Sequence, residues 1–322
     1  MPANLTPEYM AADKKFKAAT TAQDRLAALE EMLSAIPKHK GTEKMQADIK
    51  RRIAKVRAET QKRRGAARGK PFYHVDKEGA GQLVLVGAPN SGKSALLRAL
   101  SNAEPEVADY PFTTRAPLPG MMVYENVQIQ LVDLPPIDAE QSEGWLYGII
   151  RTADGALLVV DLADDDVLAE TEEVLRLLRE ANIELRATPD GPRQKQTLIV
   201  ATKLDARRAA ERLAIFREFI GDRLSVLPVS AEAGTGLDAL REASFRLLDV
   251  IRVYSKPPGK KADLTAPFIL KRGATVLDAS EAVHKDFVEK LKYARLWSHA
   301  HQGQMVGRDH VLEDGDVLEI HA

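Results

Sequence analysis

Apolar residues recur at helical spacing in the first part of the chain. One stripe ends at Pro37, and a second follows the turn at Gly41 and Thr42. The first consists of Leu26, Leu29, Leu33 and Ile36, and the second of Met45, Ile49, Ile53 and Val56. Because residues three and four apart share one face of a helix, this pattern predicts two antiparallel helices.

A different pattern begins at Gln82, where short apolar runs alternate with amphipathic segments. The runs are typical of strands buried on both faces and lie at 83–86, 127–132, 156–160, 198–201 and 225–229. Helical periodicity marks the segments 95–101, 167–181, 206–220 and 237–250. Alternating strands and helices predict an α/β fold, with a mostly parallel sheet covered by helices on both faces.

The sequence Lys256-Pro257-Pro258-Gly259 ends this alternation. A small unit follows, with strands expected at 267–272, 294–297 and 317–320 and a helix from about 279 to 291. We therefore expect a helical region (1–64), a linker (65–81), an α/β domain (82–250), a second linker (251–262) and a small α+β domain (263–322).

Charge is distributed unevenly along the chain. The net charge is −1 overall, but residues 1–80 carry +8 and the remainder −9. Basic residues concentrate between Lys50 and Lys70, where Glu59 is the only acid. This asymmetry favours contact with a polyanion such as RNA through the N-terminal helices, and a solvated helix face is the alternative.

Composition excludes several classes of protein. The chain of 322 residues has no cysteine, which rules out disulfides, a cysteine nucleophile and a thiolate zinc site. Hydrophobic residues make up 44% and charged residues 29%, as in globular proteins. No apolar run is long enough for a membrane helix, so we expect a soluble, cytoplasmic protein without a membrane partner.

A phosphate-binding loop follows the first predicted strand. Gly87-Ala88-Pro89-Asn90-Ser91-Gly92-Lys93-Ser94 fits the pattern G-x-x-x-x-G-K-[ST] and precedes a predicted helix. Its glycines allow backbone N–H groups to close on phosphate oxygens. We expect Lys93 to reach the β- and γ-phosphates and the Ser94 hydroxyl to ligate Mg²⁺.

A second motif distinguishes guanine from adenine. Thr202-Lys203-Leu204-Asp205 ends a predicted strand, and the Asp205 carboxylate can accept hydrogen bonds from guanine N1–H and the exocyclic amine. Ser230-Ala231-Glu232 follows the next strand, and its backbone N–H groups can bind the guanine oxygen. Together with the phosphate loop, these motifs predict a binding site for GTP and GDP.

Two further positions have the chemistry of a magnesium site. Asp133 ends a predicted strand, and an acid there normally holds Mg²⁺ through water. Upstream lies Asp109-Tyr110-Pro111-Phe112-Thr113-Thr114, in which either threonine can ligate Mg²⁺ when a γ-phosphate is present. A plain surface loop is the alternative for this stretch.

These motifs resemble those of the translation-factor-related GTPases of the Obg branch, especially the developmentally regulated GTP-binding proteins. GAPNSGKS, DYPFTT, DLP, TKLD and SAE follow in that family's order and spacing. The C-terminal segments IRVYSKPPGK and HKDFVEKLKYARLWSHAHQGQMVGRDHVLEDGDVLEI resemble a TGS domain, a ubiquitin-like β-grasp module. The resemblance implies a P-loop GTPase core followed by a TGS domain.

The resemblance also implies roles for individual residues. It makes Thr114 the switch I threonine, which acts in catalysis with Lys93, and it places residues 112–116 along the nucleotide. Asn90 matches an asparagine that ligates a monovalent cation in potassium-activated relatives. Ile137 stands where Ras-like enzymes have the glutamine that orients water.

The sequence departs from the family pattern in three ways. Pro136 replaces the switch II glycine, whose N–H normally bonds the γ-phosphate, and proline has no N–H. The glycine-rich sequence after it is replaced by residues 137–142. The segment 182–197 is too short for the extra domain of eukaryotic members.

We therefore expect a slow GTPase that acts in translation and docks to the ribosome or structured RNA through the basic helices and the TGS domain. The alternative, favoured by Pro136, is a poorly hydrolysing scaffold that recruits a protein partner through the TGS domain. An ATP-using kinase is disfavoured by Asp205. No residue can be named as a general base.

Overall fold

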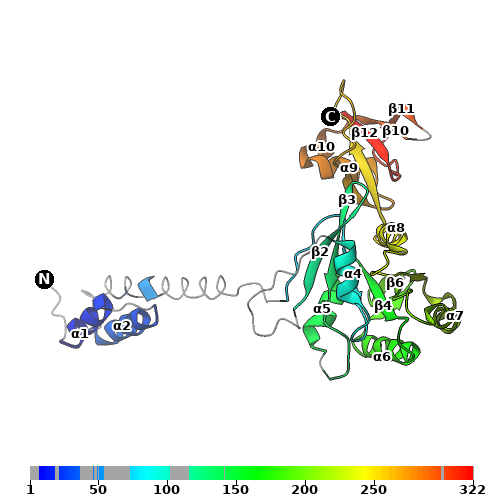
Figure 1. Cartoon of the computed structure of the whole chain (residues 1–322). Coiled ribbons are helices and arrows are strands. Elements are labelled where there is room, and N and C mark those ends of the chain that lie inside the picture. The colour runs from blue at the N-terminus through cyan, green and yellow to red at the C-terminus, as the bar shows by residue number, and fades with distance from the viewer. Residues whose placement is uncertain are drawn as a thin grey trace. The chain divides into compact units, whose positions relative to one another are not determined.

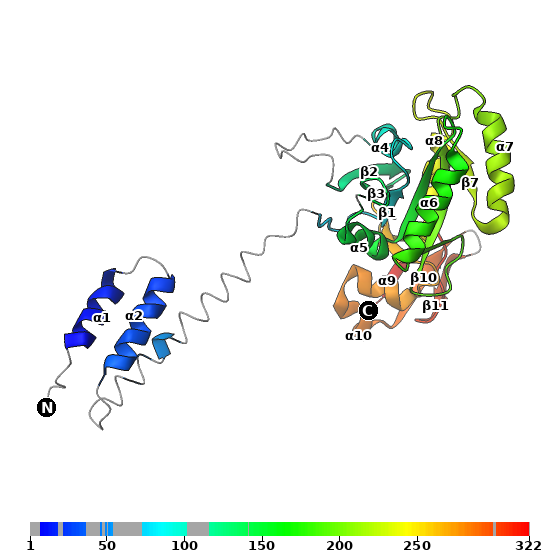
Figure 2. The same cartoon turned by 90° about the horizontal axis from the view of Figure 1, so that it is seen from below.

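The computed structural model describes residues 7–18, 22–36, 46, 49, 51–53, 73–101, 116–140, 142–298 and 301–321. The chain forms two compact units, residues 1–71 and residues 72–322. Figures 1 and 2 show the elements of both units from two sides.

The N-terminal unit begins with a helical hairpin of α1 (Pro7–Ala18) and α2 (Ala22–Ala35). The apolar side chains of its small core are Tyr9, Ala12, Leu29, Met32, Ile36, Ile49 and Ile53. Residues 49 and 51–53 are also helical, so the described residues of both predicted stripes are helical except Ile36, which follows the end of α2. Helix α1 was not predicted from the pattern. Of the basic stretch 50–70, only residues 51–53 are described.

The larger unit contains a seven-stranded sheet in the order β2-β3-β1-β4-β6-β5, with β7 also paired to β6. Its strands are β1 (Gln82–Val86), β2 (Leu118–Tyr124), β3 (Val127–Asp133), β4 (Gly155–Asp161), β5 (Glu184–Arg186), β6 (Gln194–Thr202) and β7 (Val226–Pro228). Strand β2 is antiparallel to β3, and the other pairs are parallel. The predicted, mostly parallel α/β sheet is confirmed.

Helices cover both faces of this sheet, as Figures 1 and 2 show. They are α4 (Lys93–Leu100), α5 (Gly144–Thr152), α6 (Val167–Glu180), α7 (Ala209–Ile220) and α8 (Leu237–Leu247). Side chains alternate along each strand, so Val84 and Val86 pack in the core under α5, α6 and α7. Leu83 and Leu85 pack in the second core, with α4 and α8.

A second, five-stranded sheet follows in the order β11-β10-β12-β8-β9. Its elements are β8 (Val250–Ser255), β9 (Phe268–Lys271), α9 (Val276–Val283), α10 (Lys285–Lys290), β10 (Tyr293–Trp297), β11 (Gln302–Val306) and β12 (Asp316–His321). Strand β8 lies parallel to β12, and Ile251 and Val253 are buried in its core. This mixed sheet with α9 and α10 has the expected β-grasp arrangement.

The structure corrects several predicted boundaries. Strand β8 includes residues 251–255, which we expected in the linker 251–262, because buried Ile251 and Val253 alternate with more exposed neighbours. The single helix expected at about 279–291 is two helices, since His284 has an extended backbone (φ −167°, ψ 138°) between them. Strand β2 was not predicted because Pro119 and Gly120 interrupt its sequence.

Part of the expected linker 65–81 packs against the larger unit. Tyr73 stacks on Trp145 with ring centroids 5.4 Å apart, and the Gln130 side chain donates to the Asp76 carbonyl (3.0 Å). Trp145 is therefore a packing residue. In the part of the chain that the structure describes, no helix is long and apolar enough to cross a membrane.

Candidate nucleotide-binding site

The predicted site residues that the structure describes come together where the parallel strands end. The phosphate loop follows β1, Asp133 ends β3, Asp161 ends β4 and Thr202 ends β6. The segment 230–232 follows β7. In open α/β sheets, ligands bind at this carboxyl edge. The fold therefore assembles in space the motifs that are spread over about 150 residues of sequence.

The phosphate loop has the backbone that its sequence predicts. Gly92 has φ 94° and caps the N-terminus of α4, and Asn90 also has a positive φ of 59°. A Cβ atom on Gly87 would lie 2.3 Å from the Val159 carbonyl oxygen, so only glycine fits there. The backbone N–H groups at this helix end favour an anion.

The ammonium of Lys93 is turned back onto the loop. Its Nζ donates to the carbonyls of Gly87 (3.1 Å) and Ala88 (2.7 Å) and to the Ser91 hydroxyl (3.3 Å). The side chain is buried, and this burial lowers its pKa to about 8 although the charge of Asp133 acts in the other direction. A buried cation without a carboxylate bonded to it is well suited to a phosphate.

Ser94 and Asp133 form a pair with oxygen ligands for magnesium. The Ser94 hydroxyl donates to Asp133 Oδ2, while Asp133 Oδ1 is buried without a hydrogen-bond partner. Burial raises the pKa of Asp133 despite the bonds from Ser94 and the charge of Lys93. A bound cation would satisfy the orphaned oxygen and stabilise the carboxylate, so these residues fit Mg²⁺.

The guanine motif is bonded directly to the phosphate loop. The Thr202 hydroxyl lies 2.7 Å from the Ser91 carbonyl oxygen and 3.0 Å from that of Val160. Lys203 Nζ donates to the Asn90 carbonyl (3.2 Å) and to Asp161 Oδ2 (2.5 Å). Two residues of the motif therefore fix the position of the loop.

Asp205 is exposed and ionised at the edge of this site. A hydrogen bond from the Ser230 side chain lowers its pKa, so the carboxylate is a hydrogen-bond acceptor near neutral pH. Ser230 itself is buried, and its backbone N–H donates to the Thr235 carbonyl (2.9 Å). Ser230 therefore contributes its side chain to the site, whereas its amide is used within its own turn.

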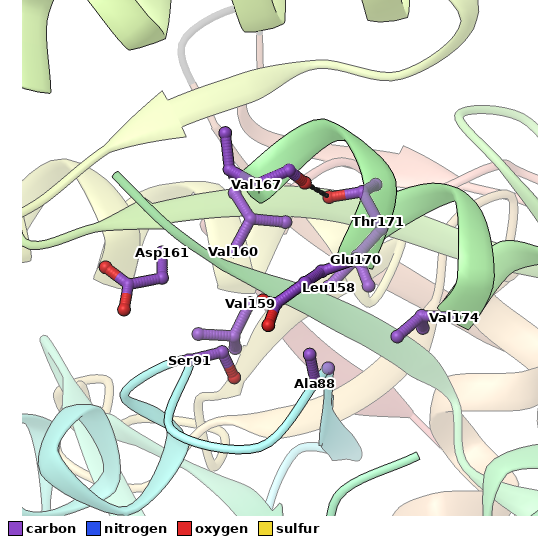
Figure 3. Close-up of a pocket in the computed structure, with 11 residues that line it drawn as sticks. Ala88, Ser91, Leu158, Val159, Val160, Asp161, Val167, Glu170, Thr171 and Val174 are labelled. Atoms are coloured by element: carbon purple, nitrogen blue, oxygen red, sulfur yellow. Dashed lines mark hydrogen bonds between the residues drawn. The ribbon is translucent and has the colours of Figure 1, made fainter. Parts of the chain in front are cut away.

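A small cavity lies between the phosphate loop and α6 (Figure 3). It has a volume of about 10 Å³, room for about one water molecule and none for a nucleotide. Glu170 lines it, and burial together with the charges of Asp164, Asp161 and Asp166 raises the pKa of this carboxyl. The accessible side of the phosphate loop is its outer side, where Pro89, Asn90 and Ser94 are exposed.

Two protein-family models match the chain, one in the segment of the first sheet and one in the segment of the second. Residues 82–203 match the model described as 50S ribosome-binding GTPase, and residues 251–322 match the TGS domain. An uncharacterized GTP-binding protein of Methanocaldococcus jannaschii is 33% identical, with 92% of each chain covered. Developmentally-regulated G-protein 2 of Arabidopsis thaliana is 30% identical, over 92% of this chain and 90% of that protein.

The chain belongs to the developmentally regulated GTP-binding proteins of the Obg branch. Among solved structures, the YchF GTPase of Schizosaccharomyces pombe has the same fold, with a TM-score of 0.53 at 12% identity. That likeness covers 78% of this chain and 99% of the other. As a member of this GTPase family, the protein binds guanine nucleotide.

The alignment with one relative contains positions that have no residue of this chain. It runs over 364 positions with the M. jannaschii protein, more than the 322 residues of this chain. Relatives therefore contain residues that have no counterpart here. In this member, the described segment from α6 to β6 contains only the short strand β5.

Two further points concern one predicted segment and one residue that the sequence did not identify. Phe112, Thr113 and Thr114 lie outside the described residues, so their roles stay predictions. Asp161 was not singled out as a site residue, although it holds Lys203. Its signal was an acid at the end of a buried strand, the same signal that identified Asp133.

Asp205 should give this family member its preference for guanine. We expect Asp205→Ala to weaken GDP binding by roughly 30- to 1,000-fold, because two hydrogen bonds to an ionised acceptor are lost, and to leave ADP binding unchanged. Calorimetry with GDP and ADP measures both affinities. Asp238→Ala, at an exposed aspartate in the first turn of α8, is the matched control. Equal affinity of the parent protein for GDP and ADP would contradict the assignment.

The buried ammonium of Lys93 should make nucleotide binding depend on pH. Phosphate stabilises the charged form, so the bound protein keeps a proton that the free protein loses as the pH rises past about 8. Binding then takes up a proton, and GDP affinity should fall about fourfold between about pH 7 and about pH 8.5. Calorimetry in buffers of different ionisation enthalpy measures the proton uptake.

Lys93→Arg is the control for this pH dependence. Arginine stays charged throughout this range, so the variant should bind GDP without the pH dependence, whatever its absolute affinity. The same fall in affinity in the variant would assign the pH dependence to another group.

Proposed function

We propose that the protein is a slow GTPase that hydrolyses GTP to GDP and phosphate and docks to the ribosome or to structured RNA. The observation that carries the nucleotide part is the direct bonding of Thr202 and Lys203 to the phosphate loop. This bonding supports one continuous site for guanine and phosphates. The proposed sites for base and phosphates are residues 87–94, 202–205 and 230–232.

Each proposed catalytic residue has a distinct role. Lys93 and the loop amides neutralise the charge that develops on the β- and γ-phosphates, which is where most of the rate enhancement arises in phosphoryl transfer. Ser94 and Thr114 would hold Mg²⁺ directly and Asp133 through water. When bound, Mg²⁺ offsets the negative charge of the β- and γ-phosphate oxygens.

Slow turnover is supported by the backbone of switch II, which lacks free N–H donors at residues 135–138. Pro135 and Pro136 have no N–H, the Ile137 amide donates to the Gly87 carbonyl (3.1 Å), and the Asp138 amide donates to the Ser142 hydroxyl (3.0 Å). The Ile137 side chain is buried in the core with only 2% exposed, which keeps its backbone in place. Four successive residues therefore offer no ready amide to a γ-phosphate.

A monovalent cation is a further proposed cofactor. Asn90 is exposed in the phosphate loop, and its carbonyl accepts from Lys203. Its side chain remains able to ligate potassium beside the phosphates, as in potassium-activated relatives. Hydrolysis should then be faster in potassium than in sodium.

The proposed partners rest on charge and family. The N-terminal segment carries the +8 charge of residues 1–80, and the matching GTPase model is described as ribosome-binding. A role at ribosomes places the protein in the cytoplasm. The second candidate, a poorly hydrolysing scaffold that recruits a protein through its TGS domain, is favoured by the missing switch II donors.

Restoring a glycine at position 136 tests the switch. We expect Pro136→Gly to tighten binding of a non-hydrolysable GTP analogue and to leave GDP binding nearly unchanged, because the regained N–H can bond only a γ-phosphate. One such bond contributes about 1.5–3 kcal/mol, and the added backbone freedom costs up to about 1 kcal/mol. Calorimetry gives the affinities, and single-turnover hydrolysis in potassium or sodium gives the rates.

Pro135→Ala is the matched control for this substitution, since it adds an N–H one residue away. If Pro136→Gly leaves the analogue unaffected or weakens it, the proposal of a disabled γ-phosphate sensor is wrong. Rapid hydrolysis by the unaltered protein alone would likewise contradict slow intrinsic turnover.

Deleting residues 1–70 tests the RNA contact. We expect the truncated protein to lose most of the salt-dependent part of its affinity for ribosomes or structured RNA, because phosphate contacts release counterions. Sedimentation with ribosomes over a series of salt concentrations measures the slope. A full-length variant, with the basic residues at 50–70 replaced by glutamine, separates loss of charge from loss of the helices. An unchanged dependence of affinity on salt would mean that residues 50–70 form a solvated helix face and do not contact RNA.

A further inference from the structure

The tip of the β2–β3 hairpin contacts the TGS domain. In Figure 1 the hairpin extends from the first sheet toward the second, and Glu125 and Asn126 form the turn at its end. Glu125 forms an ion pair with Arg252 of β8. The Asn126 Nδ2 donates to the Tyr254 hydroxyl (2.7 Å) and to the Leu264 carbonyl (3.1 Å).

Arg252 is held firmly on the TGS side of this contact. Its Nη2 and Nε donate to the two carboxylate oxygens of Asp314 (2.7 and 3.0 Å), and its side chain is only 13% exposed. Burial opposes ionisation of Asp314, but the hydrogen bonds from Arg252 outweigh it and lower the pKa of this carboxyl. The guanidinium therefore stays with Asp314 whether or not Glu125 is present.

Glu125 is the more exposed partner of its ion pair with Arg252. Its side chain is 56% exposed, so water can replace Arg252 at little cost. The guanidinium also lies over Phe245 of α8, 5.0 Å from the ring centroid, and Tyr124 packs on the same ring at 5.3 Å. The hairpin tip can therefore separate from Arg252 without leaving a buried charge unpaired, because Arg252 keeps Asp314 and Glu125 gains water.

The other end of the hairpin lies at the nucleotide site. Strands β2 and β3 pair without a break from Tyr124 opposite Val127 to Leu118 opposite Asp133. Asp133 is the proposed magnesium residue, and Leu118 comes four residues after the proposed switch I threonine, Thr114. A two-stranded ladder of seven pairs, about 23 Å long, links both loops to the TGS domain.

We propose that this hairpin couples nucleotide state to the TGS domain. Nucleotide that repositions Asp133 shifts the hairpin and alters its contacts with Arg252 and Tyr254. By linkage, a partner that binds the TGS domain in one arrangement changes nucleotide affinity by the same factor. The inference rests on the proposed guanine-nucleotide function.

The test uses the full chain with Glu125→Gln combined with Asn126→Ala, which removes the charge that pairs with Arg252 and both Asn126 hydrogen bonds, from the hairpin side only. Release of a fluorescent GDP analogue should become at least about fivefold faster, the lower end of ordinary coupling. Hydrogen exchange at residues 250–264 should differ between the GDP and GTP-analogue forms of the parent. This difference should disappear in the variant.

Arg272→Gln is the matched control, because it breaks the exposed ion pair with Asp249 (2.8 Å) near the same junction without touching the hairpin. It should leave both measurements unchanged. If the double variant does not fold, Glu125→Gln alone removes one exposed charge and serves in its place. Unchanged release, or the same nucleotide-dependent exchange in variant and parent, overturns the coupling. A parent protein that binds no guanine nucleotide overturns the proposed function itself.

Discussion

The hydrogen bond between the Thr202 hydroxyl and the Ser91 carbonyl joins the two halves of the nucleotide site. A Cβ atom on Gly92 would lie 3.2 Å from Thr202 Oγ1, so a side chain at that position would crowd the Thr202 hydroxyl. The same glycine supplies the left-handed backbone that starts α4. One contact thus fixes the loop, the first helix turn and the guanine motif together.

Much of this arrangement could be predicted from the sequence because it depends on local patterns. Buried strands such as β1 and β4 are continuous apolar runs, and the phosphate loop has glycines at fixed spacing. Elements that depend on tertiary context could not be predicted. Strand β2 contains Pro119 and Gly120, and it forms because the edge of β3 offers it hydrogen-bond partners. Strand β8 has the sequence of a linker, and it becomes a strand because it pairs with β12.

The candidate site also contains contacts that the sequence could not predict. Spacing identified Lys93, Asp133 and Asp205, but it could not reveal that Asp161 holds Lys203 or that Ile137 donates to Gly87. Both contacts join residues that are 42 or more positions apart in the sequence, and neither has a characteristic motif. The reason is physical: such bonds are set by which strands become neighbours in the sheet, and only the fold decides that.

The Gly87 carbonyl connects the phosphate loop to switch II. It accepts from both Lys93 Nζ and the Ile137 amide at 3.1 Å. When Lys93 turns to the phosphates, as we propose, it leaves this oxygen to Ile137, and a carbonyl with one donor instead of two bonds that donor more strongly. Nucleotide binding then tightens switch II against the loop. A second connection away from the phosphate loop starts at Asp133, from which strand β3 leads back to the hairpin tip at the TGS domain.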